Sequence, residues 1–276
     1  MTATGTDVSP PVYIGSERVM GFLADHGRER LRRLTWLRVL ALGMLAGAFI
    51  TTGAFLSVLL STGVASEGPA RLLQGLGFSA GFFFVILSGA VLFTEANVVL
   101  PAVVLGRRDR WRSVLRFWAL AWVGNLVGAA VTGHLIALAT HPSPGTVDQL
   151  SRIVAAKTST TGQGLGAWAA LVVSGPLANW LVGMAAFLAT MGRTLIGKYI
   201  PVFLAVTAFV SAGFQHSPAN MGFFSLNQAF VGGADVGALL TWNLLPTGLG
   251  NIAGGPIAVA ALLTWAHAPR PDRDQP

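Results

Sequence analysis

The chain has 276 residues, of which only 11% are charged, and this is under half of the ~25% that is usual for soluble domains. With 53% hydrophobic residues and a mean hydropathy of +0.63, it has too little polar material to cover a water-facing surface, so we exclude a soluble domain and expect an integral protein of the lipid bilayer. The net charge of +7 does not indicate a nucleic-acid partner, because the basic residues lie between apolar runs, and the absence of cysteine excludes disulfides and thiolate chemistry.

The amino-terminal segment, residues 1–34, is predicted to be cytoplasmic and partly amphipathic. Residues 1–27 have the composition of a polar tail, and the segment from Arg28 to Arg38 is typical of a helix along the membrane surface. The basic, apolar and small-residue pattern of a cleaved signal is missing here, so the first span is expected to serve as the targeting signal.

Stretches without Asp, Glu, Lys or Arg follow this segment. They cover residues 39–66, 72–94, 96–106, 117–147, 158–192, 199–234 and 236–269. Only Glu95 separates the second from the third, and one helix over both would be ~52 Å long, far more than the ~30 Å of hydrocarbon core. We therefore predict an all-α membrane protein with six transmembrane helices in residues 35–267, the second of them broken, followed by a cytoplasmic tail at residues 268–276.

The basic residues predict the orientation of these spans. Fifteen of the 18 precede span one, separate spans two and three, follow span four or end the chain. The other three, Arg71, Arg152 and Lys157, lie in the opposite connections. This asymmetry predicts that both termini lie on the cytoplasmic side of a cell membrane, inner or plasma.

An internal repeat divides the transmembrane domain into residues 35–140 and 166–267. Phe93 to Asn97 line up with His216 to Asn220 at an offset of 123 residues, and Gly124 to Gly128 line up with Gly250 to Gly254 at an offset of 126. Each half then has three spans. Because an odd number of spans reverses the direction of entry, the halves are predicted to be inverted, as in many transport proteins.

The first pair of matching segments predicts a break in the second and in the fifth helix. Thr94 and Ser217 are suitable N-caps for the segments after the breaks, Pro218 suits a first helical position, and Glu95 suits a first turn. Two helix N-termini near the membrane midplane would offer free N–H groups to a small anion. The alternative is that the breaks are packing kinks whose polar residues satisfy their own backbone.

His216 is the central polar residue of the second break. An ionisable group inside a membrane is a functional candidate, and imidazole can donate a hydrogen bond to an anion or relay a proton to it. A single histidine does not make a metal site, and a nucleophile paired with a base is not recognisable. We expect no cofactor, no metal and no enzymatic activity.

These residues resemble the formate/nitrite transporter family over residues 30–267. The similar segments are Leu92 to Thr94, Phe209 to Met221, the Gly124-Asn125 and Gly250-Asn251 pairs, and Ala178 to Val182. The resemblance implies an aquaporin-like, inverted-repeat fold, a homo-pentamer, and in each protomer a pore for a small monovalent anion. It also implies two apolar constrictions on either side of a polar middle.

The resemblance assigns pore residues by position. His216 matches the central histidine, Thr94 the threonine facing it, and Lys157 a basic residue that draws anions toward the pore. The pore and substrate candidates are His216, Thr94, Asn220, Asn179, Ser217, Asn97, Glu95 and Lys157. The outer constriction is assigned to Phe78 and Phe209, and the inner one to Phe82 and Leu92, with Phe82 at a position where smaller aliphatic residues are common.

Two residues depart from the family pattern. Glu95 stands next to Thr94 where a neutral residue is usual, and a carboxylate there would repel anions unless it is protonated, capped by amides or turned away from the pore. Gln215 replaces an acidic residue that often precedes the histidine. A solvated loop charge is the alternative role for Lys157.

The predicted function is transport of formate, nitrite or a similar weak-acid anion, with His216 aiding its binding or protonation. Burying a bare anion costs several kcal/mol, and protonation removes that cost. The alternatives are a proton-coupled transporter of another weak acid or small solute, a water or neutral-solute channel, and a non-transporting scaffold. The chain has Glu-Ala-Asn and Pro-Ala-Asn at its breaks where water channels have two Asn-Pro-Ala boxes.

Overall fold

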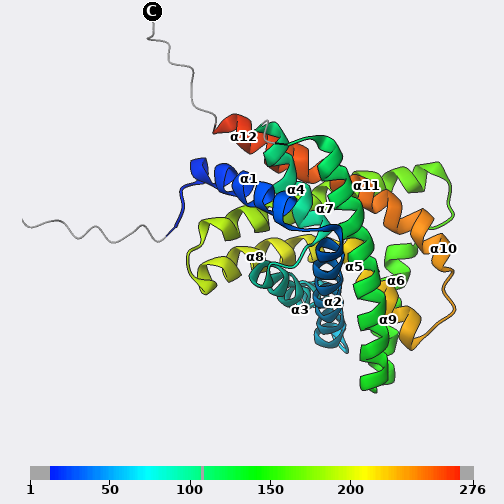
Figure 1. The fold of residues 1–276 in the computed structure, drawn as a ribbon. Coiled ribbons are helices and arrows are strands. Elements are labelled where there is room, and N and C mark those ends of the chain that lie inside the picture. The colour runs from blue at the N-terminus through cyan, green and yellow to red at the C-terminus, as the bar shows by residue number, and fades with distance from the viewer. Residues whose placement is uncertain (1–12, 107–108, 268–276) are drawn as a thin grey trace, which may run out of the picture.

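The computed structural model describes residues 13–106 and 109–267, and its ordered elements there are all helical (Figure 1). The predicted fold class, an all-α protein with several apolar helices, is confirmed. In chain order the elements are α1 (Ser16–Arg33), α2 (Trp36–Ser61), α3 (Glu67–Ser88), α4 (Phe93–Leu105), α5 (Trp111–Ala139), α6 (Pro144–Thr158), α7 (Leu165–Met191), α8 (Leu195–Ser211), α9 (Ser217–Phe230), α10 (Val236–Leu239), the π-helix η1 (Leu240–Leu244), α11 (Leu245–Gly254), the π-helix η2 (Gly255–Ala261) and α12 (Leu262–Ala266).

Five helices in the described part of the chain are long and apolar enough to cross a membrane. They are α2, α3, α5, α7 and the continuous helix from Val236 to Ala266. Two further apolar helices, α4 and α8, are shorter, with 13 and 17 residues. The count of six spans therefore stays a prediction, while the chain is clearly of the multi-pass membrane type.

Glycines bring two helix pairs into backbone contact, one pair in each half of the sequence. A Cβ on Gly124 of α5 would lie 2.8 Å from the Leu40 carbonyl oxygen of α2. A Cβ on Gly250 of α11 would lie 2.4 Å from the Val172 carbonyl oxygen of α7. No side chain fits at either crossing, so α2 with α5 and α7 with α11 pack as equivalent tight pairs.

The chain leaves the helical conformation at both places where the repeat predicts a break. Between α3 and α4 the turn uses Gly89 at φ 70°, and between α8 and α9 it uses Gly213 at φ 75°, both in the left-handed region that favours glycine. After each turn the chain enters a short helix, α4 or α9. Each short helix packs against the other half of the sequence, α4 against α7 and η2, and α9 against α2 and α5.

The predicted capping positions are wrong by one or two residues. The N-caps are Leu92 and His216, so Thr94 and Ser217 lie inside the first turns, and Pro218 is the second helical residue. Leu92 and His216 are 124 residues apart, which moves the repeat alignment by one position. A hydroxyl cap is unnecessary because side chains from distant helices bind the first N–H groups, as described below.

The amino-terminal helix begins earlier than the sequence predicts, because residues 16–27, expected in a polar tail, belong to α1. Its buried side is formed by Val19, Met20, Leu23, Ala24 and Gly27. These apolar positions recur every three to four residues, which is the spacing of one face of an amphipathic helix. The charged residues between them lower the mean hydropathy of the segment, so the sequence reads as a polar tail. The buried face packs on α4 and α7, so protein rather than lipid covers it. The predicted tails at residues 1–12 and 268–276 lie outside the described residues.

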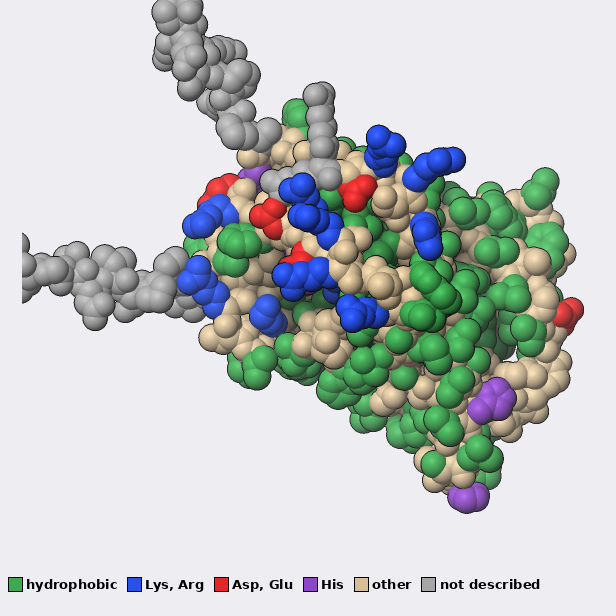
Figure 2. Space-filling model, in the orientation of Figure 1, with side chains coloured by type: hydrophobic (Ala, Val, Ile, Leu, Met, Phe, Trp, Pro, Cys, Tyr) green, Lys and Arg blue, Asp and Glu red, His purple; other side chains and the backbone are tan. Residues whose placement is uncertain are grey.

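The surface separates charge from apolar area (Figure 2). Blue and red side chains gather over α1 and its surroundings, and green apolar side chains cover much of the rest of the visible face. Large apolar side chains are strongly exposed, including Leu165 at 82% and Leu138 at 80%. Exposed apolar area of this kind suits contact with lipid and not with water.

Candidate functional site

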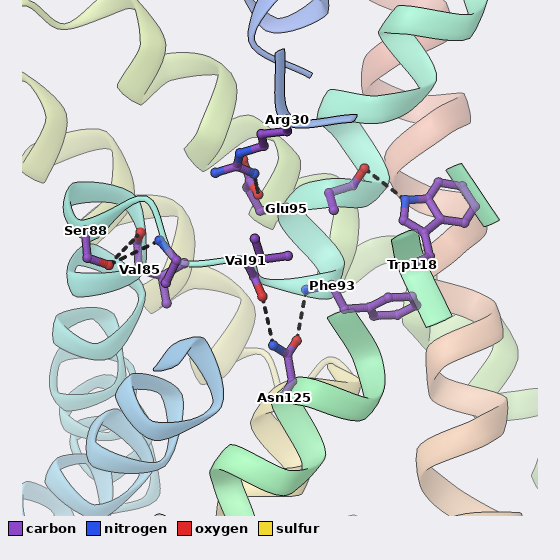
Figure 3. A network of polar contacts seen from close by, with 10 residues as sticks. Arg30, Val85, Ser88, Val91, Phe93, Glu95, Trp118 and Asn125 are labelled. Carbon is purple, nitrogen blue, oxygen red and sulfur yellow. Dashed lines mark hydrogen bonds and ion pairs between the residues drawn. The ribbon is translucent and has the colours of Figure 1, made fainter. Parts of the chain in front are cut away.

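An asparagine from α5 holds the first break in place (Figure 3). Asn125 is fully buried, and its Oδ1 accepts a 2.9 Å hydrogen bond from the Phe93 N–H at the start of α4. Its Nδ2 donates to the carbonyl oxygens of Val91 and Gly43, each at 2.9 Å. One side chain thereby satisfies backbone groups on both sides of the break, which is the requirement for non-helical chain inside a membrane.

Asn251 repeats this arrangement at the second break. Its Oδ1 accepts from the Ser217 N–H at 2.9 Å, and its Nδ2 donates to the Gly175 and Gln215 carbonyl oxygens at 2.9 and 3.0 Å. The sequence repeat includes both asparagines, but it does not reveal their role, because each acts on residues more than 30 positions away. The glycine that precedes each asparagine lies at a backbone contact, and this brings the amide within reach of the break.

His216 and Thr94 meet between the two breaks, as predicted. His216 Nε2 lies 2.8 Å from Thr94 Oγ1, and both side chains are fully buried. The Ala219 N–H donates to His216 Nδ1 at 3.1 Å, so Nδ1 is an acceptor and carries no proton. The hydrogen-bond network therefore assigns the proton of a neutral imidazole to Nε2, which donates to Thr94 Oγ1. Thr94 keeps its own O–H as a donor.

Aromatic rings pack beside this pair. Phe78 contacts Phe209 edge-on and stacks on Phe223, with ring centroids 6.0 Å apart in both cases, and Phe209 lies 5.2 Å from the imidazole of His216. Phe78 and Phe209 were predicted as a constriction, and the structure brings them together with Phe223, which sequence reasoning missed. Phe82, one helical turn beyond Phe78, is fully buried in the same cluster.

Leu92, the partner predicted for Phe82 in the inner constriction, is the N-cap residue of α4. It is also fully buried in this cluster. Whether the two residues form a constriction stays a prediction.

A cavity of about 430 Å³ opens on one side of these rings, and we name it the α6-side cavity. Its lining includes Arg71, Arg152 and Lys157, the three basic residues that the charge pattern places opposite to the others, together with Phe209 and Phe223. Arg71 forms an ion pair with Glu67 at 2.8 Å, and Arg152 contacts Asp148.

Lys157 differs from the two arginines of the α6-side cavity. Its Nζ lies 5.3 Å from the ring centroid of Phe223, and its side chain is partly buried. Burial lowers the pKa of Lys157 to about 8. In the part of the chain that the structure describes, no carboxylate forms an ion pair with it. The role of Lys157 in drawing anions and the alternative of a solvated loop charge both stay predictions.

A second cavity, of about 460 Å³, lies at the other ends of α3 and α8, and we name it the α1-side cavity. Its charged lining consists of Arg30 and His26 from α1, Glu95 from α4 and Lys198 from α8. Arg30 donates to the Glu95 carboxylate at 2.7 Å (Figure 3). An arginine that sequence reasoning did not connect with the pore is therefore the partner of this carboxylate.

Comparison with known proteins identifies the family. The formate/nitrite transporter family matches residues 18–265. The chain belongs to this family. A probable formate transporter of Methanothermobacter thermautotrophicus is 35% identical over 247 residues, which cover 83% of this chain and 89% of that relative. The formate channel FocA of Escherichia coli strain K12 is 28% identical over 249 residues, with 83% and 86% covered.

Solved structures show the same fold. An FNT family ion channel superposes with a TM-score of 0.78 at 24% identity, covering 91% of this chain and 99% of that one. A pentameric formate channel with formate bound gives a TM-score of 0.69 at 24% identity, covering 84% and 96%. The resemblance seen in the sequence is thus confirmed, and the family is one of transporters and channels of small anions.

The remaining candidate residues lie around the central pair, and the Asn220 N–H donates to the His216 carbonyl oxygen at 2.9 Å. Ser217 Oγ donates to the Leu244 carbonyl oxygen at 3.1 Å. Asn220 Nδ2 donates to Gln215 and Asn243, each at 2.8 Å, and so links the second break to η1.

Two further asparagines lie near Gly255 of η2. Asn179 Nδ2 donates to the Asn251 carbonyl oxygen at 2.6 Å. Asn97 is fully buried, and neither side-chain polar atom has a hydrogen-bond partner among the described residues. A Cβ on Gly255 would lie 2.7 Å from the Asn97 carbonyl oxygen and 2.9 Å from Asn179 Nδ2, so the two asparagines approach each other there. Pore roles for all four of these candidates stay predictions.

Proposed function

We propose that each protomer transports a small monovalent weak-acid anion, formate or nitrite, between the α1-side and α6-side cavities. The observation that supports this most is the buried pair of His216 and Thr94, 2.8 Å apart beside the two helix breaks and next to three phenylalanine rings. The family relationship supports the substrate class, since relatives include a formate channel and a probable formate transporter.

The proposed pathway has an attracting end, an apolar filter and a polar centre. An anion enters the α6-side cavity toward Lys157, which has no ion-pair partner among the described residues, whereas Arg71 and Arg152 are paired with Glu67 and Asp148. Beyond Phe78, Phe209 and Phe223 it would lose most of its water, and an isolated buried charge costs several kcal/mol. The Thr94 hydroxyl and the first turns of α4 and α9 then supply hydrogen-bond donors and partial positive charge.

His216 acts in this proposal as a neutral donor. Its Nδ1 caps α9 through the Ala219 N–H, so a proton added there would displace a helix cap. Its Nε2–H donates a hydrogen bond to Thr94 Oγ1 and keeps its proton, which leaves the Thr94 O–H free to turn toward the anion as the anion arrives. The substrate crosses the apolar rings as the neutral acid, with a proton supplied from the water on the side that it leaves.

Assembly and orientation follow from the same comparison. We propose a homo-pentamer with a separate pore in each protomer, because a structure of the same fold is described as a pentameric formate channel. The cluster of basic residues around α1 supports a cytoplasmic position for this face and for both termini in the cell membrane. Exposed apolar residues on the other faces are available for lipid and for neighbouring protomers.

The test is formate flux into proteoliposomes as a function of pH. Replacing His216 with Phe or Asn, or Thr94 with Val, is expected to reduce flux about tenfold or more, since removal of a hydrogen bond in a dry site costs ~1–3 kcal/mol. Thr94→Ser keeps the hydroxyl and should retain flux. His134→Phe is the matched control, because among the described residues His134 bonds the Ala130 carbonyl oxygen of its own helix and no other group. Unchanged, pH-independent flux in the His216 variants would refute the proposal, and rapid osmotic water flow without formate flux would favour a water channel.

A further inference from the structure

The Arg30–Glu95 ion pair links the amino-terminal helix to the centre of the molecule. Glu95 lies in the first turn of α4, directly after Thr94, and only 7% of its side chain is exposed. Arg30 comes from the last turn of α1 and is 11% exposed. Figure 3 shows the pair beside the break that Asn125 holds. Burying two charges this deeply removes much of their hydration, and this costs free energy. The pair is therefore not explained as charge that keeps a protein surface soluble.

We propose that Arg30 is the counter-charge that makes the pore beside Glu95 passable to anions, so that α1 sets the charge selectivity of the α1-side cavity. The inference rests on the proposed function, since it concerns the same anion pathway. Arg30 acts through Glu95 and is a positioning residue, while Glu95 is the group whose charge the anion would meet.

The charges that line the α1-side cavity support this assignment. Arg30 and Glu95 cancel each other, and Lys198 forms no ion pair within the described part of the chain. Burial, and then the charge of Arg30, lower the pKa of His26, so this histidine adds no charge at neutral pH. The cavity therefore has a net positive lining, which would become neutral without Arg30.

The apolar packing of α1 is independent of the pair. Val19, Met20, Leu23 and Ala24 are buried against α4 and α7, so most of the contact area of α1 remains when one charge is removed. A purely structural pair would make its two members equivalent in mutagenesis. A counter-charge makes them opposite, and this difference in sign is what the experiment measures.

The experiment compares Arg30→Gln, Glu95→Gln and the double variant as purified full-length chains in proteoliposomes, with formate flux as the readout. Arg30→Gln leaves the Glu95 carboxylate uncompensated beside Thr94. Formate flux is expected to fall about tenfold to a hundredfold, because the partly buried carboxylate then repels the anion. Glu95→Gln is expected to keep or raise the wild-type flux. The double variant should recover most of the flux lost in Arg30→Gln. Arg30→Lys keeps the positive charge and should retain the wild-type flux.

The matched control is Arg33→Gln. Arg33 is on the same helix, carries the same charge and pairs with Glu29 at 3.0 Å, but its side chain is 77% exposed. This variant removes one positive charge from the surface and is expected to leave flux within about twofold of wild type, because an exposed charge is screened by salt.

The outcomes separate the inference from the proposed function. Equal losses in Arg30→Gln and Glu95→Gln, or no change in Arg30→Gln, would overturn the inference while anion transport stands. If Arg30→Gln fails to purify as a folded oligomer, Glu95→Gln alone decides: flux below wild type overturns the inference, and flux at or above it agrees. A wild-type chain that passes none of formate, nitrite or hydrosulfide refutes both.

Discussion

Replacing Asn251 with Leu tests how the second break is held. Leucine has a similar volume, so the change removes hydrogen bonds without leaving a large hole. The Ser217 N–H and the Gln215 carbonyl lose the partner that lies 2.9 and 3.0 Å away, and both Asn251 and Ser217 are fully buried. Each buried polar group left unpaired costs about 1–3 kcal/mol, which gives a destabilisation of about 2–6 kcal/mol for the two together.

The assay is thermal unfolding of the purified chain in detergent, followed by intrinsic fluorescence. For a chain of this size 1 kcal/mol corresponds to roughly 2–4 °C, so the variant is expected to melt about 10 °C below wild type. Asn125→Leu should behave alike, because Asn125 makes the same three bonds at the first break. Asn227→Leu is the control, since the buried Oδ1 of Asn227 has no hydrogen-bond partner among the described residues. An Asn251→Leu variant with the same melting temperature as the Asn227→Leu control would refute the reasoning.

Three further predictions concern the pathway and its frame. The pKa of Lys157 is lowered to about 8, so its charge is lost as pH rises from 7 to 9. Formate flux through the wild type should therefore fall over that range relative to flux through Lys157→Arg, which stays charged. A ratio of wild-type flux to variant flux that does not change with pH would exclude Lys157 as an attracting charge. Phe209→Ala should raise acetate flux relative to formate flux in proteoliposomes, because it removes one ring of the buried trio. Gly250→Ala should lower the melting temperature far more than Gly68→Ala, because its Cβ would lie 2.4 Å from the Val172 carbonyl oxygen whereas Gly68 has open space.

Local patterns predicted the parts of the fold that depend on local physics. The scarcity of charge and the long apolar runs were enough for an all-helical membrane protein, and the excessive length of the run around Glu95 located the first break within a few residues. The pairing of Thr94 with His216 followed from the resemblance to the family. Phe78 and Phe209 were likewise found together.

The errors come from interactions between residues far apart in the sequence. Thr94 was expected to cap α4 because hydroxyl side chains usually cap the turn that follows them, but Asn125 supplies the cap from another helix. The charge of Glu95 was a departure from the family pattern, and only the position of α1 showed that Arg30 neutralises it. The alternation of charged and apolar residues in α1 concealed a helix whose apolar face is buried.

The two capping asparagines hold the backbone at the helix breaks, and they are not among the residues proposed to meet the substrate. Asn125 and Asn251 reach the breaks from α5 and α11, whose glycines lock them against α2 and α7, so the backbone at each break is fixed by residues outside the aromatic cluster. Except for His216, which itself caps α9, the side chains proposed to meet the substrate can therefore change with little effect on the chain that presents them. We therefore expect substitutions at Glu95 or Phe82 to change which small anion passes while the fold is kept, provided that the asparagines and their glycines are left untouched.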